Sequence, residues 1–219
     1  MSRLLVITLG FRVEYQVRFL MRNMPSKGDY VLVLVPRKRE GEEPERAKSA
    51  VEEIRKFVDK FLPGVPLRLV EVPLSSPEEG LGVIIRELSE YGGKVGEVVL
   101  CLSGGMRALV LVTLAAALYA VPQHMLRIEV DLEGWGKWVE LAPHLFRLEP
   151  LLVDESKVIN ALARKTRTLD ELAAATNIPR TTLYKRLKRL VARGLVEEER
   201  IGRKVFYRLT KLGKALASH

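Results

Sequence analysis

Four short runs of Val, Leu and Ile recur along the first part of the chain, and each is followed by a segment with helical period. The runs cover residues 3–9, 30–35, 67–72 and 98–102, and the helical segments cover residues 14–24, 42–61, 76–91 and 106–120. Continuously apolar strands are typical of a parallel sheet that is covered on both faces. Strict alternation of strand and helix therefore predicts a mostly parallel, Rossmann-like α/β domain.

Local signals sharpen the limits of this domain. Ser76, followed by Pro77 and Glu79, is a capping box that predicts the start of the third helix. Residues 127–131 and 137–141 flank a glycine-containing turn and predict a hairpin that closes one sheet edge. The alternating pattern ends in residues 143–153, whose apolar residues predict a packed connector. The expected domains are residues 1–142 and 154–219, joined by this connector.

The last part of the chain has a different pattern. Residues 154–163 form a first helical segment, a capping box at residues 168–171 begins a second, and residues 180–193 form a third. Residues 195–200 and 204–209 then alternate as two strands around Gly202. Helix, turn, helix and hairpin in this order predict a second, smaller domain with a winged helix-turn-helix fold.

The net charge of the chain lies almost entirely in this smaller domain. The formal net charge is +9 and the sequence pI is about 9.7; residues 151–219 hold 16 Lys and Arg against 7 Asp and Glu, whereas residues 1–150 hold 20 of each kind. Such a pI would also suit RNA or an anionic membrane. Because the cations lie on a patterned helical module and not in a polybasic run, double-stranded DNA is the expected partner, with no membrane association.

Candidate DNA-binding side chains follow from the motif. In a winged helix-turn-helix, the start of the second helix of the motif contacts base edges in the major groove, and the wing contacts the neighbouring DNA backbone. Here that helix is the third helical segment, residues 180–193. We expect Arg180 to pair with guanine, Thr182 to touch a thymine methyl group, and the wing to hold phosphates. The whole predicted set is Arg180, Thr181, Thr182, Tyr184, Lys185, Lys188, Arg203 and Lys204. The alternative is that these charges only solvate a small helical domain.

A candidate ligand site lies in the larger domain, where ligands of open α/β sheets bind at the carboxyl ends of the strands. Two loops qualify, one after the first strand and one after the fourth. Their glycines, backbone amides and polar side chains suit a phosphate group. The predicted ligand-binding residues are Thr8, Gly10, Phe11, Ser103, Gly104, Gly105, Met106 and Arg107. A tight turn from strand to helix also needs glycine, and neither a P-loop nor the dinucleotide-binding glycine motif is present.

Residues 8–11, residues 102–107 and the following winged helix together resemble the archaeal CRISPR-associated transcriptional regulators of the Csa type, which join a CARF domain to a winged helix-turn-helix. This resemblance covers almost the whole chain. It implies a homodimer whose paired CARF domains bind a cyclic oligoadenylate, with the four-membered ring as the first candidate, and a role in antiviral defence at CRISPR-related promoters. Family members often carry an acidic residue soon after the phenylalanine of the first loop, whereas here Arg12 comes first and Glu14 later.

The resemblance also raises an enzymatic alternative, because some CARF proteins cleave the cyclic messenger as ring nucleases. Glu14, Ser103 and Arg107 are the side chains that could assist such a reaction by orientation and charge stabilisation. The three histidines, His124, His144 and His219, lie away from the predicted site. We therefore predict a regulator without catalytic residues, metal or cofactor. In the ring-nuclease alternative, the winged helix would be an accessory domain.

The remaining signals concern location and assembly. A single cysteine, Cys101, lies in an apolar strand, which predicts a buried thiol. Residues 1–10 lack the features of a signal peptide, and residues 108–121 are too few to span a bilayer, so a cytoplasmic protein is expected. That helical segment is apolar nearly all round, which favours a second copy of the chain as its cover, with burial under the connector as the alternative. Trp135, at the predicted hairpin tip, is expected to pack against the neighbouring domain or to stack on adenine.

Overall fold

A computed structural model describes residues 1–37 and 45–217, and the chain divides into the units Met1–Pro143 and His144–His219. In the first unit the strands are β1 (Arg3–Thr8), β2 (Tyr30–Pro36), β3 (Leu67–Val72), β4 (Glu97–Cys101), β5 (Leu126–Leu132) and β6 (Lys137–Leu141). Its helices are α1 (Glu14–Asn23), α2 (Glu45–Phe61), α3 (Pro77–Glu90) and α4 (Arg107–Ala120), with a 3-10 turn, η1 (Gln123–Met125), before β5 and another, η2 (Pro143–Phe146), where the unit ends.

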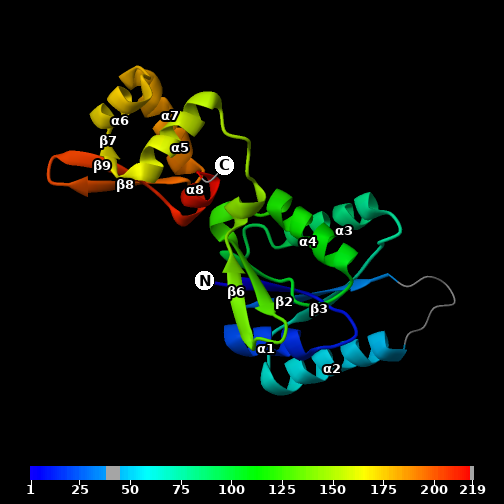
Figure 1. The fold of residues 1–219 in the computed structure, drawn as a ribbon. Helices are drawn as coiled ribbons and strands as arrows, with labels where there is room; N and C mark the ends of the chain where they lie inside the picture. The colour runs from blue at the N-terminus through cyan, green and yellow to red at the C-terminus, as the bar shows by residue number, and fades with distance from the viewer. Residues whose placement is uncertain (38–44, 218–219) are drawn as a thin grey trace. The chain divides into compact units, whose positions relative to one another are not determined.

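The six strands form one sheet in the order β3-β2-β1-β4-β5-β6 (Figure 1). β1 pairs in parallel with both β2 and β4, and only β6, paired with β5, is antiparallel. The strand order reverses between β1 and β4, which is the switch point where such folds bind ligands. The predicted Rossmann-like architecture and the hairpin at the sheet edge are both confirmed.

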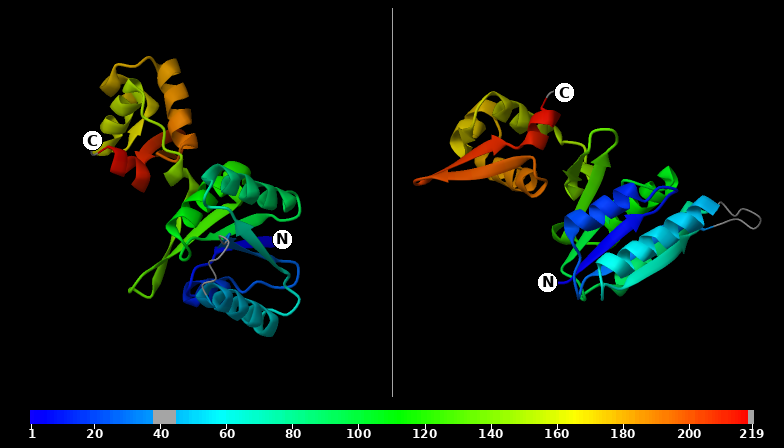
Figure 2. Two further views of the ribbon diagram at one scale, coloured as in Figure 1. Left: turned by 90° about the vertical axis from the view of Figure 1, so that its right-hand side faces the viewer. Right: turned by 90° about the horizontal axis from the view of Figure 1, so that it is seen from below.

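Helices cover both faces of this sheet, α1 and α2 on one and α3 and α4 on the other (Figures 1 and 2). Successive residues of β1 point to opposite faces, so Leu5 and Ile7 pack with Phe19 of α1, and Leu4 and Val6 join the core under α3 and α4. All four of these strand residues have 0% exposure. This double covering explains why the parallel strands are apolar throughout.

The helix starts differ in detail from the sequence prediction. The Ser76 side chain accepts from the Glu79 backbone N–H at 3.4 Å, but the Glu79 carboxylate pairs with Arg37 at 3.5 Å and does not complete the capping box. α2 begins at Glu45, and the start predicted at residue 42 lies outside the described residues. The strand and helix ends elsewhere agree with the prediction to within one or two residues.

The second unit is a winged helix-turn-helix, as predicted. Its elements are α5 (Val153–Arg164), β7 (Arg167–Thr168), α6 (Leu169–Thr176), α7 (Arg180–Ala192), β8 (Val196–Ile201), β9 (Lys204–Leu209) and α8 (Lys211–Leu216). Thr168 and Glu171 form the complete capping box of α6, and Asn177 takes the left-handed φ of 55° that turns the chain toward α7. The strand β7 and the helix α8 were not predicted, and α8 packs against the core formed by α5, α7 and β9.

Ion pairs join α7 to the first turn of α5 and to the connector before it. Glu155, whose side chain is 0% exposed, lies 3.3 Å from Arg189 Nε and 3.1 Å from an Arg193 terminal nitrogen. Glu149 adds a 2.9 Å ion pair with Arg189, and Leu151 packs against the core of the second unit. This part of the connector is therefore held against the C-terminal half of the helix that the sequence assigns to DNA.

Candidate functional site

A cavity of about 1390 Å³ lies at the carboxyl ends of β1, β2, β3 and β4 in the first unit. The β1–α1 loop (residues 9–13) and the β4–α4 loop (residues 102–106) meet there, beside the point where the strand order reverses. Of the eight predicted ligand-binding residues, seven line this cavity: Gly10, Phe11, Ser103, Gly104, Gly105, Met106 and Arg107. The two loops singled out from sequence thus come together in space.

Two of the loop glycines are required by geometry. A Cβ atom on Gly10 would lie 2.9 Å from both the Cα and the N of Gly105, so the backbones of the two loops touch at this point. Gly105 itself has a φ of +98°, a conformation that side chains other than glycine rarely adopt. Both glycines therefore permit the close approach that gives the cavity its floor.

Thr8 was predicted to contact the ligand, and its position in the structure differs from that prediction. Its side chain is 0% exposed and does not line the cavity. The hydroxyl donates into the β4–α4 loop instead, where the Gly104 carbonyl and, at 3.3 Å, the Cys101 carbonyl accept. Below the same loop, the buried Gln16 donates to the Thr8 carbonyl at 2.8 Å. Thr8 and Gln16 support the loop from beneath, because Thr8 is the last residue of β1 and faces inward.

The cavity has the features of an anion site on its α4 side. Met106 caps α4 without a side-chain hydrogen bond, and no acidic residue lies in the first turn of the helix. The first backbone N–H groups of a helix have no partner inside it and attract negative charge. Arg107 and Arg12, both exposed, line the same cavity and make no ion pair with any residue in the described ranges.

Phe11 lines the cavity next to these cations. Its side chain is 62% exposed. An exposed ring beside two arginines can stack on a planar group while the cations hold phosphates.

Two residues of the enzymatic alternative have partners within the chain. The Ser103 hydroxyl donates to an Asp131 carboxylate oxygen at 3.2 Å and accepts from the Asp131 backbone N–H at 2.7 Å. Glu14 pairs with Arg18 one helical turn away and does not line the cavity. Of the three side chains proposed for cleavage, Ser103 and Arg107 line the cavity, whereas Glu14 does not.

Sequence reasoning missed the other half of the cavity. Arg37 after β2, Leu69 and Glu71 on β3, and Arg55 on α2 all line it. The signal was available, because parallel strands end at the same edge of a sheet, and the segments after β2 and β3 must therefore lie beside the β1–α1 loop. These segments carry no glycine motif, which is why only the loops after β1 and β4 drew attention.

Cys101 is buried in β4, and burial raises the pKa of its thiol to about 11. A thiol in this state is a poor nucleophile. Across residues 1–37 and 45–217, no three His, Cys, Asp or Glu side chains are grouped as a metal site would require.

The outer face of α4 is apolar and exposed. Leu111 is 65% exposed and Tyr119 is 79% exposed, and Ala108 and Ala115 lie on the same stripe of the helix. Leu111 also lines the cavity, so the stripe begins at the cavity edge.

In the part of the chain that the structure describes, no helix is long and apolar enough to cross a membrane. Trp135, at the hairpin tip, is 75% exposed and does not line the cavity.

The second candidate site is the exposed side of α7. Leu183, Leu187 and Leu190 anchor the helix in the core, which leaves the predicted residues Arg180, Thr181, Tyr184 and Lys185 exposed and Thr182 half-buried. Arg180 pairs with Asp170 at 2.9 Å, but both side chains are about two-thirds exposed, at 65% and 67%. An ion pair this exposed contributes about 0–1 kcal/mol, so DNA can replace it at little cost.

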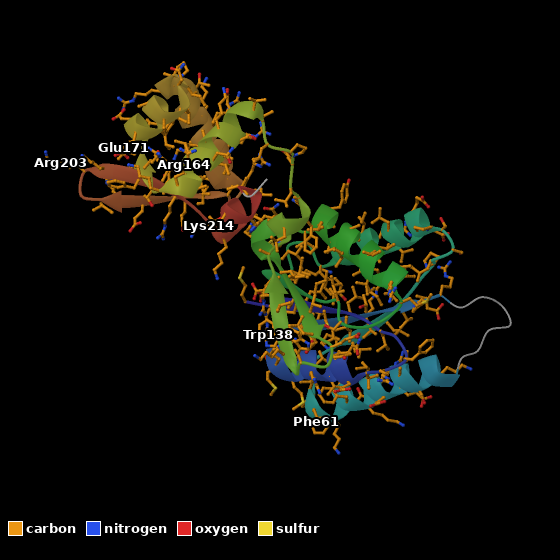
Figure 3. The ribbon with its side chains drawn as sticks, viewed as in Figure 1. Phe61, Trp138, Arg164, Glu171, Arg203 and Lys214 are labelled. Atoms are coloured by element: carbon orange, nitrogen blue, oxygen red, sulfur yellow. The ribbon has the colours of Figure 1, made fainter. Side chains whose placement is uncertain are left out.

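The remaining predicted DNA-binding residues are Lys188 and the two residues of the wing. Gly202 has a φ of 62° at the first position of a two-residue turn, which places Arg203 at the hairpin tip with Lys204 beside it (Figure 3). Lys188 is exposed and pairs with Glu198 of β8 at 3.2 Å. The hydrogen bond to Glu198 raises the pKa of Lys188, which keeps it cationic.

Each of the two units matches a family model. The model described as the Csa3 CRISPR-associated Rossmann-like domain matches residues 3–142, and the model described as the sugar-specific transcriptional regulator TrmB matches residues 152–212. Among curated protein sequences, none matches this chain at a significant level.

Several solved structures are similar to part of the chain. BpsR of Bordetella bronchiseptica, a DNA-binding protein regulated by 6-hydroxynicotinic acid, is 32% identical over 31% of this chain and 51% of its own, with a TM-score of 0.30. The MarR family regulator SPO1453 from Silicibacter pomeroyi is 30% identical over 31% of this chain and 50% of its own, with a TM-score of 0.30. AdcR from Streptococcus pyogenes is 25% identical over 33% and 57%, with a TM-score of 0.31. The chain thus spans only about half the length of these proteins.

Proposed function

The chain belongs to the family defined by the Csa3 CRISPR-associated Rossmann-like domain, and on this premise we propose that it is a ligand-gated transcription regulator. Its CARF domain binds a cyclic oligoadenylate, with cyclic tetra-adenylate as the first candidate, and its winged helix-turn-helix binds promoter DNA. The ligand acts by favouring one arrangement of the protein over another, which requires different affinities for the two arrangements.

One observation carries the ligand assignment: the cavity joins a helix N-terminus without a side-chain cap, two arginines that make no ion pair within residues 1–37 and 45–217, and an exposed aromatic ring. A cyclic oligoadenylate offers phosphates to the first two features and adenine rings to the third. The cavity is also larger than the 300–1,000 Å³ typical of small-molecule sites, at about 1390 Å³. This volume suits a ligand made of several nucleotides.

We propose that the active form is a homodimer formed through the outer face of α4. The exposed stripe with Leu111 and Tyr119 would otherwise present apolar surface to water. Because Leu111 lies on both the stripe and the cavity edge, a second copy on this face would bring two cavities together around one symmetric ring. A two-fold dimer also matches the symmetry of a palindromic operator.

The proposal is tested by fluorescence anisotropy with labelled cyclic oligoadenylates of several ring sizes, using linear oligoadenylates of equal length as controls. We expect saturable binding of a cyclic ligand and weaker binding of its linear counterpart. Failure of every cyclic ligand to bind would refute the ligand assignment. Appearance of linear product during the incubation would replace the pure sensor with the ring-nuclease alternative.

Arg180→Ala is expected to relax sequence discrimination by the winged helix. Loss of a bidentate contact to guanine lowers the discrimination between the cognate base pair and others by about 1–3 kcal/mol. Competition binding with operator variants measures this change, and Arg164→Ala, which removes an exposed arginine at the end of α5 (Figure 3), is the matched control. Unaltered operator preference in the Arg180 variant would argue against this docking of α7.

Lys204→Ala is expected to weaken DNA binding about equally for all sequences. A phosphate contact releases counterions, so removing it should reduce the slope of log K against log salt by about 1. A salt titration of DNA affinity provides the measurement, with Lys157→Ala on α5, an exposed lysine, as control. If both variants keep the wild-type slope, the wing does not hold phosphate through Lys204.

A further inference from the structure

Ser103 is fixed to β5 by two hydrogen bonds. Its hydroxyl accepts from the Asp131 backbone N–H at 2.7 Å and donates to the Asp131 carboxylate at 3.2 Å. Ser103 also lines the ligand cavity. A serine hydroxyl has a single proton to donate, so a phosphate oxygen in the cavity and the Asp131 carboxylate compete for it.

Asp131 belongs to a buried polar cluster with fixed geometry. Its two carboxylate oxygens accept from Arg22 of α1 at 3.4 and 3.3 Å, and Glu129 accepts from Arg22 Nε at 2.8 Å. The carboxylates are only 6% and 1% exposed. Burial alone would lower the pKa of Arg22, but its hydrogen bonds to Asp131 and Glu129 raise that pKa above the ordinary arginine value, so Arg22 is a permanent cation here.

Arg22 connects the cluster to β6, the last strand of the sheet. Its guanidinium carbon lies 4.5 Å from the centre of the Trp138 ring, and Trp138 stands opposite Asp131 in the β5–β6 register. Figure 3 shows Trp138 on β6, next to α1. β6 ends at Leu141, directly before the connector. The cluster therefore extends from the cavity wall to the strand from which the connector leaves.

We propose that Ser103, Asp131, Arg22 and Trp138 form a polar relay that reports occupation of the cavity to the β5–β6 hairpin. This inference rests on the proposed function for the identity of the occupant. When a phosphate oxygen accepts the hydrogen bond of the Ser103 hydroxyl in place of the Asp131 carboxylate, Asp131 loses one of its donors and draws closer to Arg22. The Arg22 guanidinium then shifts over the Trp138 ring, and this displacement acts on β6 through Trp138. Ser103 is on this account a positioning residue and not only a phosphate contact.

The relay can be read by fluorescence because the chain holds 2 tryptophans. Trp135→Phe, at an exposed position on the hairpin tip, leaves Trp138 as the sole tryptophan, whose emission is selected by exciting at wavelengths where tyrosine does not absorb. In this background and without ligand, Ser103→Ala should shift the Trp138 emission, and Ser103→Thr, which keeps the hydroxyl, should restore it. Ser75→Ala, at another serine of the cavity lining, should leave the emission unchanged. No shift in Ser103→Ala would overturn the relay.

Ligand addition supplies the second arm. Cyclic tetra-adenylate should change Trp138 emission in the Trp135→Phe protein, and Ser103→Ala should suppress that change while calorimetry still detects binding. Binding without any change of emission would also overturn the relay. Absence of binding in calorimetry would refute the proposed ligand, whereas the ligand-free comparison of Ser103 variants would still decide whether Ser103 acts on Trp138.

Discussion

Replacing Gly10 by alanine is expected to abolish ligand binding and to lower the free energy of unfolding of the N-terminal unit by about 1–3 kcal/mol, the usual cost of overpacking. The new Cβ would meet Gly105 Cα and N at 2.9 Å. Backbone cannot rotate out of the way as a side chain end can, so the β1–α1 and β4–α4 loops must separate. Their separation removes the cavity floor.

The matched control for this prediction is Gly82→Ala. Gly82 lies inside α3, and the nearest atom to a Cβ there is a terminal nitrogen of Arg86 at 3.9 Å. Alanine should stabilise the helix by up to about 1 kcal/mol and leave ligand affinity unchanged. Thermal unfolding and calorimetry on both variants measure the two effects. Wild-type ligand affinity in the Gly10 variant would show that the ligand binds elsewhere.

Arg107→Ala is expected to weaken cyclic oligoadenylate binding about tenfold to hundredfold, because hydrogen bonds to charged groups contribute about 1.5–3 kcal/mol. Arg107 is exposed at the start of α4 and pairs with no acidic residue among those the structure describes, so its removal should cost little stability. DNA affinity without ligand should remain that of the wild type.

Titration calorimetry gives the affinity for this variant, and Arg86→Ala on α3, outside the cavity lining, is its control. Equal ligand affinity for the Arg107 variant and the wild type would remove the proposed role of this arginine. A parallel loss in the Arg86 variant would point to a general effect of net charge.

The architecture was predictable because its signals are local. Apolar strands alternating with helical segments gave the parallel sheet, and the capping box at Thr168 gave the start of α6. The two glycine loops could be paired without coordinates because both follow parallel strands and must lie at one sheet edge. Glycine marks such positions in the sequence, since few other residues fit there.

The site details were not predictable because they depend on side-chain direction and on distant partners. Thr8 could point into the cavity or below the loop, and only packing decides that it points inward. Arg22 and Asp131 are separated by 109 positions in the chain, and no periodicity relates them. Polar pairs of this kind have no pattern in the sequence, whereas helix caps and strand faces repeat at fixed spacing.

We propose that the chain couples ligand binding in the N-terminal cavity to DNA binding by the winged helix. Anisotropy of labelled promoter DNA, titrated with the protein in the absence and presence of saturating cyclic tetra-adenylate, tests it most directly. We predict that the dissociation constant for DNA changes by about fivefold or more, the usual size of allosteric coupling. Identical DNA-binding curves, with the ligand bound as shown by calorimetry, would show that ligand binding and DNA binding are not coupled.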